Sequence, residues 1–249
     1  MGGFFFLYFH CEMVEHTEEI KLEDYDDEDI YDVVAKLERS FGLNFDKDAF
    51  WLVQTFGDLC DVFERHIAFE PKRDCTTQQA FYRVRKAIGA TQLMDENLIV
   101  PDSRLADIFP KQDRRTKIRA FKELLGVQVK ILTYPDWLGR VLRAGFLLSF
   151  IAVFFDWKIA LSAVVFLILI DRIAEKSGTT LTLQTVGQLS GKLVREHYVD
   201  IRRSETTVNR EEIVPIIVDV FSNDLDIEKC YLTRDAKFSW AKYATCAVD

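Results

Sequence analysis

The histidines and cysteines of this chain are the side chains best suited to catalysis or metal binding, and their spacing predicts neither. The four histidines lie far apart, and no Cys-x-x-Cys pair occurs. The five cysteines are Cys11, Cys60, Cys75, Cys230 and Cys246. Cys60 and His66 share one predicted helix, but six residues separate them, so they do not face each other. We therefore predict no metal site, no cofactor and free thiols in a reducing compartment.

Known catalytic motifs are also missing from the sequence. No G-x-S-x-G, P-loop, G-x-G-x-x-G or H-E-x-x-H pattern occurs. His66 and His197 lie near the ends of predicted helices, where the helix dipole stabilises a surface imidazolium. The acidic stretches offer no sign of a buried carboxylate pair. The sequence thus predicts no catalytic residue and a protein that is not an enzyme.

Charge is distributed unevenly along the chain. The formal net charge is -8 for 249 residues, which argues against nucleic acid as a partner because binding to phosphates needs cations. Acidic residues dominate Glu12 to Asp32, where Lys21 is the one lysine. Basic residues gather in the middle of the chain at Arg83, Arg85, Lys86, Lys111, Arg114, Arg115, Lys117, Arg119 and Lys122. Opposite charge runs favour either solvated faces or docking of one surface on another.

The basic helix predicted at 114–125 offers candidate contact residues, namely Arg114, Arg115 and Lys117. One interpretation is a solvated face. The other is contact with anionic lipid headgroups or with the acidic N-terminal stretch, each basic residue near a membrane contributing about 1 kcal/mol.

Two apolar runs in the middle of the chain predict a helical hairpin over 135–173. Ala144 to Phe155 and Ile159 to Ile170 are separated by Asp156-Trp157-Lys158. Each is about a dozen residues, but flanking arginines that extend their charges to the interface could lengthen both to the roughly 20 residues that cross a bilayer. Because phenylalanines surround every face, we expect a membrane hairpin; the alternative is a buried core hairpin.

The flanks of the hairpin predict its orientation. Positive charges lie at the outer ends of both runs and the turn is near neutral, which is the pattern of a multi-pass inner-membrane protein with both termini cytoplasmic. The expected membrane-interface residues are Trp137, Arg140, Arg143, Trp157, Lys158 and Arg172.

Helical periodicity covers much of the remaining chain. Apolar residues at helical spacing predict helices over 30–41, 56–67, 80–90, 114–125 and 211–221. Gly42 is placed to end the first of these helices. Thr55 and Asn209 are placed to cap two others.

The segment 37–67, LERSFGLNFDKDAFWLVQTFGDLCDVFERHI, resembles the second half of an acyl carrier protein. In that family a long helix ends in an E-E-F-G-type sequence, an extended loop follows, and T-V-G-D opens the last helix. Phe41-Gly42-Leu43 and Thr55-Phe56-Gly57-Asp58-Leu59 match those two places.

The second module resembles the same family over a longer stretch. Pro101-Asp102-Ser103-Arg104-Leu105 is similar to the first loop and Leu125-Gly126-Val127 to the end of the second helix. Thr185-Val186-Gly187-Gln188-Leu189 is similar to the start of the last helix, which the resemblance extends to about Glu196. Residues 209–240 resemble a first half: helix 211–221, then Leu232 to Phe238 as the loop. We hypothesise that the two chain ends complete one bundle, in cis or across a homodimer, because neither half alone can bury an apolar helix face.

The resemblance implies a serine for a phosphopantetheine arm, and the expected positions lack it. Counting back from the helix-ending glycines places this serine near Asp27 in the first module and near Lys111 in the second. In acyl carriers the modified serine lies in an Asp-Ser-Leu sequence. Ser239 follows the loop at 232–238, but it too lacks this sequence. No phosphopantetheine site is therefore predicted. The resemblance then implies only the shape of a carrier and its ability to dock partner proteins.

These observations lead to an all-α fold of carrier-like bundles with an inserted two-helix transmembrane hairpin. The expected segments are a disordered or spurious extension at 1–12, carrier-like helices at 13–72, an interrupted bundle at 73–200 and first-half helices at 201–249. The predicted function is a membrane-anchored, non-catalytic docking or scaffold protein, linked to lipid or acyl-chain metabolism, whose partners are the bilayer and unidentified proteins. The alternatives are a working carrier modified at an unorthodox serine and a subunit of a membrane lipid enzyme.

Overall fold

The computed structural model describes residues 21–46, 48–154, 156–204 and 206–241, and helices make up most of it. The expected extension at 1–12 lies outside this range. In chain order the α-helices are α1 (Asp27–Phe41), α2 (Phe56–His66), α3 (Thr76–Gln92), α4 (Leu105–Ile108), α5 (Arg114–Leu125), α6 (Asp136–Ala152), α7 (Trp157–Ser177), α8 (Val186–Glu196), α9 (Tyr198–Ile201) and α10 (Arg210–Leu225). The strands are two-residue pairs: β1 (Glu70–Pro71), β2 (Leu132–Thr133), β3 (Thr180–Leu181) and β4 (Thr207–Val208).

The predicted helices are confirmed, because local signals determine where they begin and end. Gly42 follows α1 in the left-handed region at φ 62°, and Gly126 follows α5 at φ 78°. Thr55 accepts a hydrogen bond from the N–H of Asp58, and Asn209 accepts one from Glu211, so both cap their helices as expected.

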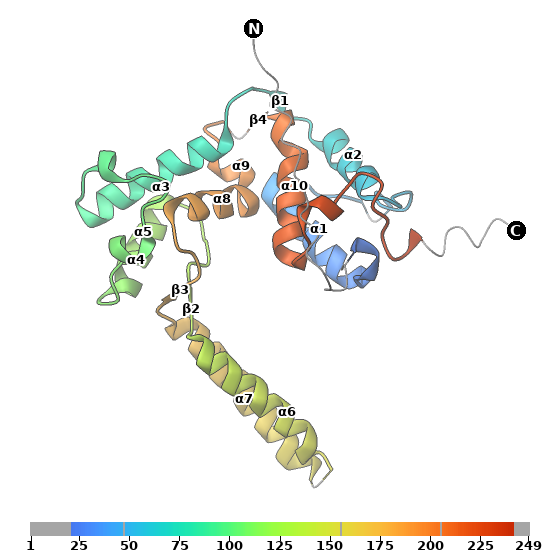
Figure 1. Ribbon diagram of the computed structural model, residues 1–249, viewed down its shortest axis with the longest axis vertical. Helices are drawn as coiled ribbons and strands as arrows, with labels where there is room; N and C mark the ends of the chain where they lie inside the picture. The colour runs from blue at the N-terminus through green and yellow to red at the C-terminus, as the bar shows by residue number, and fades with distance from the viewer. Residues whose placement is uncertain (1–20, 47, 155, 205, 242–249) are drawn as a thin grey trace, which may run out of the picture. The chain divides into compact units, whose positions relative to one another are not determined.

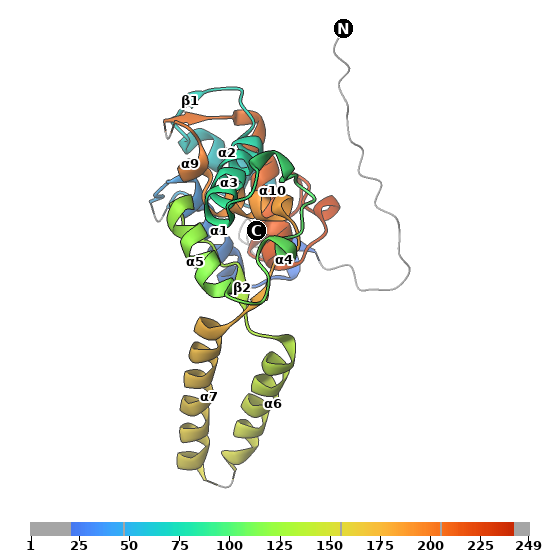
Figure 2. The ribbon, with the colours of Figure 1, turned by 90° about the vertical axis from the view of Figure 1, so that its left-hand side faces the viewer.

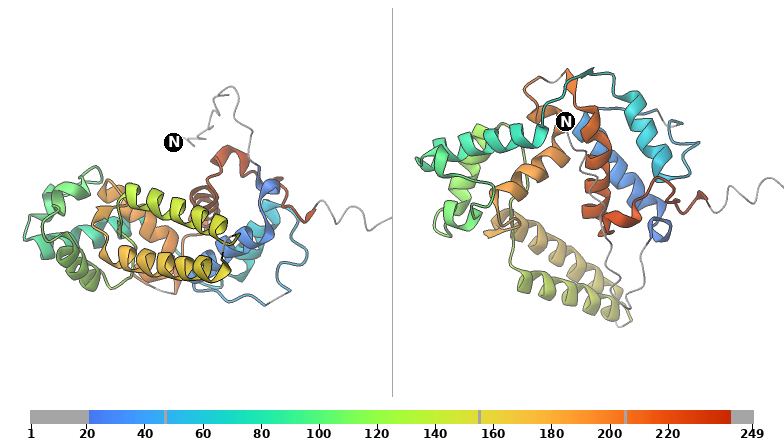
Figure 3. Two further views of the ribbon diagram at one scale, coloured as in Figure 1. Left: turned by 90° about the horizontal axis from the view of Figure 1, so that it is seen from below. Right: turned by 45° about the horizontal axis from the view of Figure 1, so that its top comes forward.

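The chain divides into two compact units, and unit 1 combines an early and a late segment of the sequence. It comprises the described residues up to 79 and those from 193 to 241. Within it α10 packs on both α1 and α2, as the right-hand view of Figure 3 shows. The rings of Phe56 and Phe221 meet edge to face with centroids 5.2 Å apart, and both side chains are fully buried. Helices from the early and late parts of the described chain therefore share one apolar core.

A buried arginine lies in unit 1 near the parallel strand pair β1–β4. Arg202 is only 3% exposed, and its guanidinium donates to the Thr76 hydroxyl at 2.6 Å and to the Asp74 carboxylate. Burial raises the pKa of Asp74, but hydrogen bonding and charge from Arg202 outweigh it, so the pKa is lowered overall. Because its guanidinium is hydrogen-bonded and paired with a carboxylate, Arg202 links the start of α3 to the end of α9.

Unit 2 spans residues 80–192 and has a smaller core. Phe109 and Phe121 pack with ring centroids 5.6 Å apart, both fully buried. The Arg83 guanidinium donates to the carbonyl of Leu125 at 3.1 Å, which ties α3 to the end of α5. These helices form the small bundle from which the hairpin leaves.

The hairpin consists of α6 and α7, which lie side by side and extend from the antiparallel pair β2–β3 (Figures 1 and 2). Asp156 begins α7 by accepting a hydrogen bond from the N–H of Lys158 at 2.8 Å. Many large apolar side chains of both helices are exposed, among them Leu147, Phe150, Phe166 and Leu169, and so is Phe154 in the turn between them.

The expectation that this hairpin is transmembrane is wrong: within the described ranges, no helix has the length and the uninterrupted apolar character needed to cross a bilayer. The physical reason lies in length and charge. α6 has 17 residues and carries Asp136, Arg140 and Arg143 in its first part, and the apolar run of α7 stops at Asp171. Charges therefore occupy positions that a span of roughly 20 apolar residues would need.

This finding also removes the localisation that depended on the hairpin. The predicted multi-pass inner-membrane location required a spanning pair of helices, and the described helices provide none. The flanking arginines were expected to extend their charges to the interface and so lengthen the apolar segments. The charged ends of these helices do not add to the apolar length.

Candidate functional site

A short backbone contact joins the start of α2 to the loop after α10 in unit 1. The N–H of Gly57 donates to the carbonyl of Arg234 and that of Phe56 to Ala236, both at 2.8 Å, while Phe238 donates to Gln54 at 3.1 Å. Thr55 and Lys237 form an antiparallel bridge there. We call this contact the unit 1 clamp.

The same contact recurs in unit 2 at the start of α8. The N–H of Gly187 donates to the carbonyl of Pro101 at 2.8 Å, that of Val186 to Ser103 at 3.0 Å, and that of Leu105 to Gln184 at 2.9 Å. Arg104 and Thr185 form the bridge. This unit 2 clamp pairs the two stretches that the sequence singled out as first loop and last-helix start.

The unit 1 clamp brings Ser239 to the start of α1. Its hydroxyl donates to the carboxylate of Asp27, the first residue of that helix, at 2.6 Å. Trp240 fixes the neighbouring backbone, because its indole N–H donates to the carbonyl of Val53 at 2.7 Å. Asp27 and Ser239, which the sequence treated as two separate positions, thus lie together. Lys111 lies exposed before α5 in unit 2.

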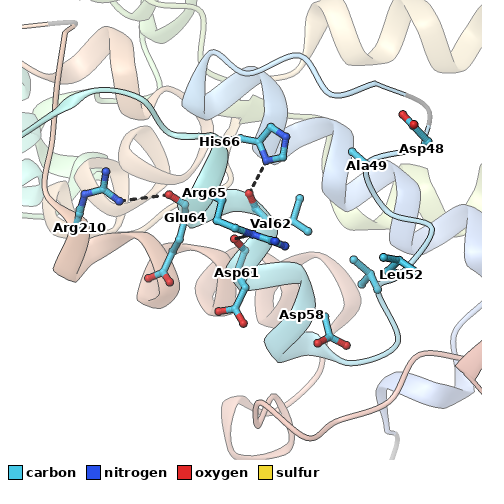
Figure 4. Close-up of a pocket in the computed structure, with 11 residues that line it drawn as sticks. Asp48, Ala49, Leu52, Asp58, Asp61, Val62, Glu64, Arg65, His66 and Arg210 are labelled. Atoms are coloured by element: carbon cyan, nitrogen blue, oxygen red, sulfur yellow. Dashed lines mark hydrogen bonds between the residues drawn. The ribbon is translucent and has the colours of Figure 1, made fainter.

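A cavity of about 950 Å³ lies along the outer face of α2 in unit 1 (Figure 4). It is lined by Asp48, Ala49, Leu52, Val53, Asp58, Asp61, Val62, Glu64, Arg65, His66 and Arg210. Leu52 is 91% exposed at its rim, and the adjacent Trp51 is 85% exposed. Exposed aromatic and aliphatic side chains of this size are more typical of contact surfaces than of a solvated loop.

The basic side chains of this cavity are turned toward backbone carbonyls. Arg210 donates to the carbonyl of Glu64 at 3.3 Å, and the Nε of Arg65 donates to Asp61 at 3.0 Å. His66 donates from Nδ1 to the carbonyl of Val62 at 2.8 Å. The carboxylates of Asp48, Asp58 and Glu64 have no ion-pair partner within the described segments, so the cavity presents an acidic wall.

Asp58 stands at the junction of this cavity and the unit 1 clamp. Burial raises its pKa, but hydrogen bonds from Thr55 and from the backbone N–H of Gln54, with the charge of Arg234, lower it overall. The lowered pKa favours the ionised carboxylate, which completes the cap of α2.

No catalytic constellation is assembled by the residues that the structure describes. Cys60 is fully buried, and burial raises the pKa of its thiol to about 12, so it is not a nucleophile. His197 contacts Asp200 at 3.3 Å, three residues away on the surface. Over the described ranges no group of histidine, cysteine and carboxylate side chains could hold a metal ion.

The three basic residues proposed as contacts on α5 have different surroundings. Arg114 is only 6% exposed and donates to the carbonyls of Phe109 and Thr179, so it ties the bundle to the base of the hairpin. Arg115 is exposed and donates to the carbonyl of Lys176 at 2.6 Å, whereas Lys117 is half-buried outside any described cavity. The sequence could not separate them, because burial depends on packing from distant segments.

The residues expected at a membrane interface lie at the two ends of the hairpin. Trp157 and Lys158 are at its tip, with the ammonium 6.0 Å from the indole centroid. Trp137, Arg140, Arg143 and Arg172 lie toward its base and are exposed. Their grouping follows from the antiparallel helices, but no spanning helix gives them the predicted role.

Comparison with known proteins leaves the chain without an identified relative. No protein family model, no curated protein and no solved structure matches it. The resemblance to acyl carriers therefore rests on the short motifs alone.

Sequence reasoning missed the exposed pair Trp51-Leu52. The run Ala49 to Val53 is continuous and apolar, and its pattern does not separate buried from exposed side chains. In the structure Val53 is buried and the turn points Trp51 and Leu52 outward. The available signal was the acidic Asp46 and Asp48 just before them, which place this turn at the surface.

Proposed function

We propose that this protein is a non-catalytic docking protein that holds a segment of a partner protein on unit 1. The observation that carries this proposal is exposed Leu52, which lines the 950 Å³ cavity on α2, together with its exposed chain neighbour Trp51. Buried aromatic anchors supply much of the binding energy of protein interfaces, and an exposed tryptophan beside a cavity is suited to become one on binding.

Charge defines the partner segment. Asp48, Asp58 and Glu64 line the cavity, while its two arginines are directed at backbone carbonyls. The segment that fits carries an apolar residue for Trp51 and Leu52 next to a lysine or arginine for the acidic wall. The inert Cys60 thiol and the surface histidines support a role in binding over one in catalysis.

The test is affinity purification of the tagged full-length protein from its native extract. Trp51→Ser with Leu52→Ser should lose a partner that the wild type retains, and raised salt should weaken that partner's binding. Leu98→Ser with Leu124→Ser is the matched control, because both leucines are exposed in unit 2. A partner set retained equally by both double variants would contradict the proposal.

A working acyl carrier is the second candidate, and the contact between Ser239 and Asp27 favours it. This contact places a hydroxyl at the start of α1, where the resemblance expects a modified serine. Incubation with a phosphopantetheinyl transferase and coenzyme A tests it by intact mass. The mass gain of one arm on the wild type, absent from Ser239→Ala, would establish the carrier; an unmodified wild type would reject it.

A further inference from the structure

A basic groove lies in unit 2 between α5 and the end of α7, distinct from the docking cavity. Its volume is about 620 Å³, and it is lined by Arg115, Ile118, Arg119, Lys122, Gln128, Val129, Lys130, Leu132, Glu175, Lys176 and Gly178. Ile118 and Val129 are almost fully buried and form an apolar floor. We call it the α5 groove.

Positive charge is concentrated in the α5 groove although the whole chain is acidic. Its lining has five cationic side chains and a single carboxylate, Glu175, which pairs with Lys130 at 2.7 Å. Arg115 is directed at the carbonyl of Lys176. Across the parts of the chain that are described, no carboxylate pairs with Arg119 or Lys122.

This concentration has an energetic cost that an anion would offset. Arg115, Arg119 and Lys122 follow each other at helical spacing on α5, where like charges repel. Burial, together with the nearby Lys192, lowers the pKa of Lys122. A bound anion would relieve both effects and bring that pKa back toward its ordinary value.

We propose that the α5 groove binds a phosphorylated small molecule. Guanidinium groups match phosphate oxygens in a bidentate manner, and lysines add point charge. The volume falls within the range of small-molecule sites, roughly 300–1,000 Å³. The apolar floor suits the non-phosphate part of such a ligand. An extended acidic peptide would have no apolar group to place there.

Titration of the full-length protein with inorganic pyrophosphate tests this site. Wild-type protein should bind it saturably, and Arg119→Gln with Lys122→Gln should bind at least about tenfold more weakly, since charge-assisted hydrogen bonds are lost. Lys86→Gln with Lys111→Gln removes the same charge from exposed positions outside the groove and should change affinity less than about twofold.

A second measurement on the wild type does not depend on any variant. The Lys122 ammonium, followed by NMR, should titrate at a higher pH when pyrophosphate is bound, because the anion stabilises the charged form. Non-saturable binding, equal losses in both double variants, or an unchanged Lys122 titration would overturn the proposal. So would displacement of pyrophosphate by a poly-glutamate peptide of equal charge, or binding to phosphatidylglycerol vesicles without binding to pyrophosphate.

Discussion

The unit 1 clamp and the unit 2 clamp make the same pattern of hydrogen bonds, although the loop and the helix that they join occur in opposite order along the sequence. In unit 2 the loop at 101–105 precedes its helix α8, and the hairpin lies between them. In unit 1 the loop at 234–238 follows its helix α2 by most of the chain length. The comparison teaches that this contact depends on three backbone hydrogen bonds and a close-fitting glycine, and not on the order of the connected pieces.

The closest approach also differs between the two clamps. A Cβ at Gly57 would lie 2.7 Å from the backbone carbonyl oxygen of Arg234, whereas one at Gly187 would lie 3.2 Å from that of Pro101. Unit 1 is thus the tighter contact. Since it also joins the early and late segments of unit 1, disrupting it should have wider consequences.

The largest expected effect comes from the aromatic cores of the two units. Phe221→Ala should cost unit 1 about 3–5 kcal/mol through the cavity left beside Phe56. Hydrogen exchange should then show lost protection across α1 and α2, since α10 packs on both. Phe121→Ala is the matched change in unit 2 and should lower protection in α5 instead. Equal loss in α1 and α2 from both variants would show that the units do not unfold separately.

The glycines should separate the two clamps. Gly57→Ala should destabilise unit 1 by about 2 kcal/mol, because the backbone must shift away from the new methyl group. Gly187→Ala should be near neutral, since the milder contact is offset by the roughly 1 kcal/mol that alanine gains over glycine within a helix. Urea unfolding measures both; if Gly187→Ala costs as much as Gly57→Ala, the clamps are equally tight.

A smaller, pH-dependent effect should distinguish the caps. Asp58 accepts from the N–H groups of Gln54 and Thr55, and Gln188 accepts from that of Gln184. The lowered pKa of Asp58 means that its stabilisation is present above the unfolded-state pKa and is lost as the pH falls through the folded-state pKa.

Asp58→Asn should therefore lower stability by about 0.3–1 kcal/mol at pH 7, the range for a carboxylate at a helix N-terminus, and by less at pH 3. Gln188→Asn should show no such change with pH, because an amide does not titrate. Urea midpoints at the two pH values measure it, and parallel losses for Asp58→Asn at pH 3 and pH 7 would refute the assignment.

Sequence reasoning predicted the local parts of the fold well. Helix caps and glycine ends act within about four residues, so Thr55, Asn209 and Gly42 could be assigned from the chain alone. The prediction of a spanning hairpin failed because apolar runs near 12 residues are ambiguous, and Asp171 and Arg143 decided against it.

The sequence by itself determined the helix boundaries, the repeated threonine–glycine starts and the absence of known catalytic motifs, because each depends on neighbouring residues. Only the tertiary structure decided that Arg114 is buried and Arg119 exposed, and that Trp51 faces outward. The physical reason is that burial and charge environment arise from segments far apart in sequence, whose meeting no local pattern encodes.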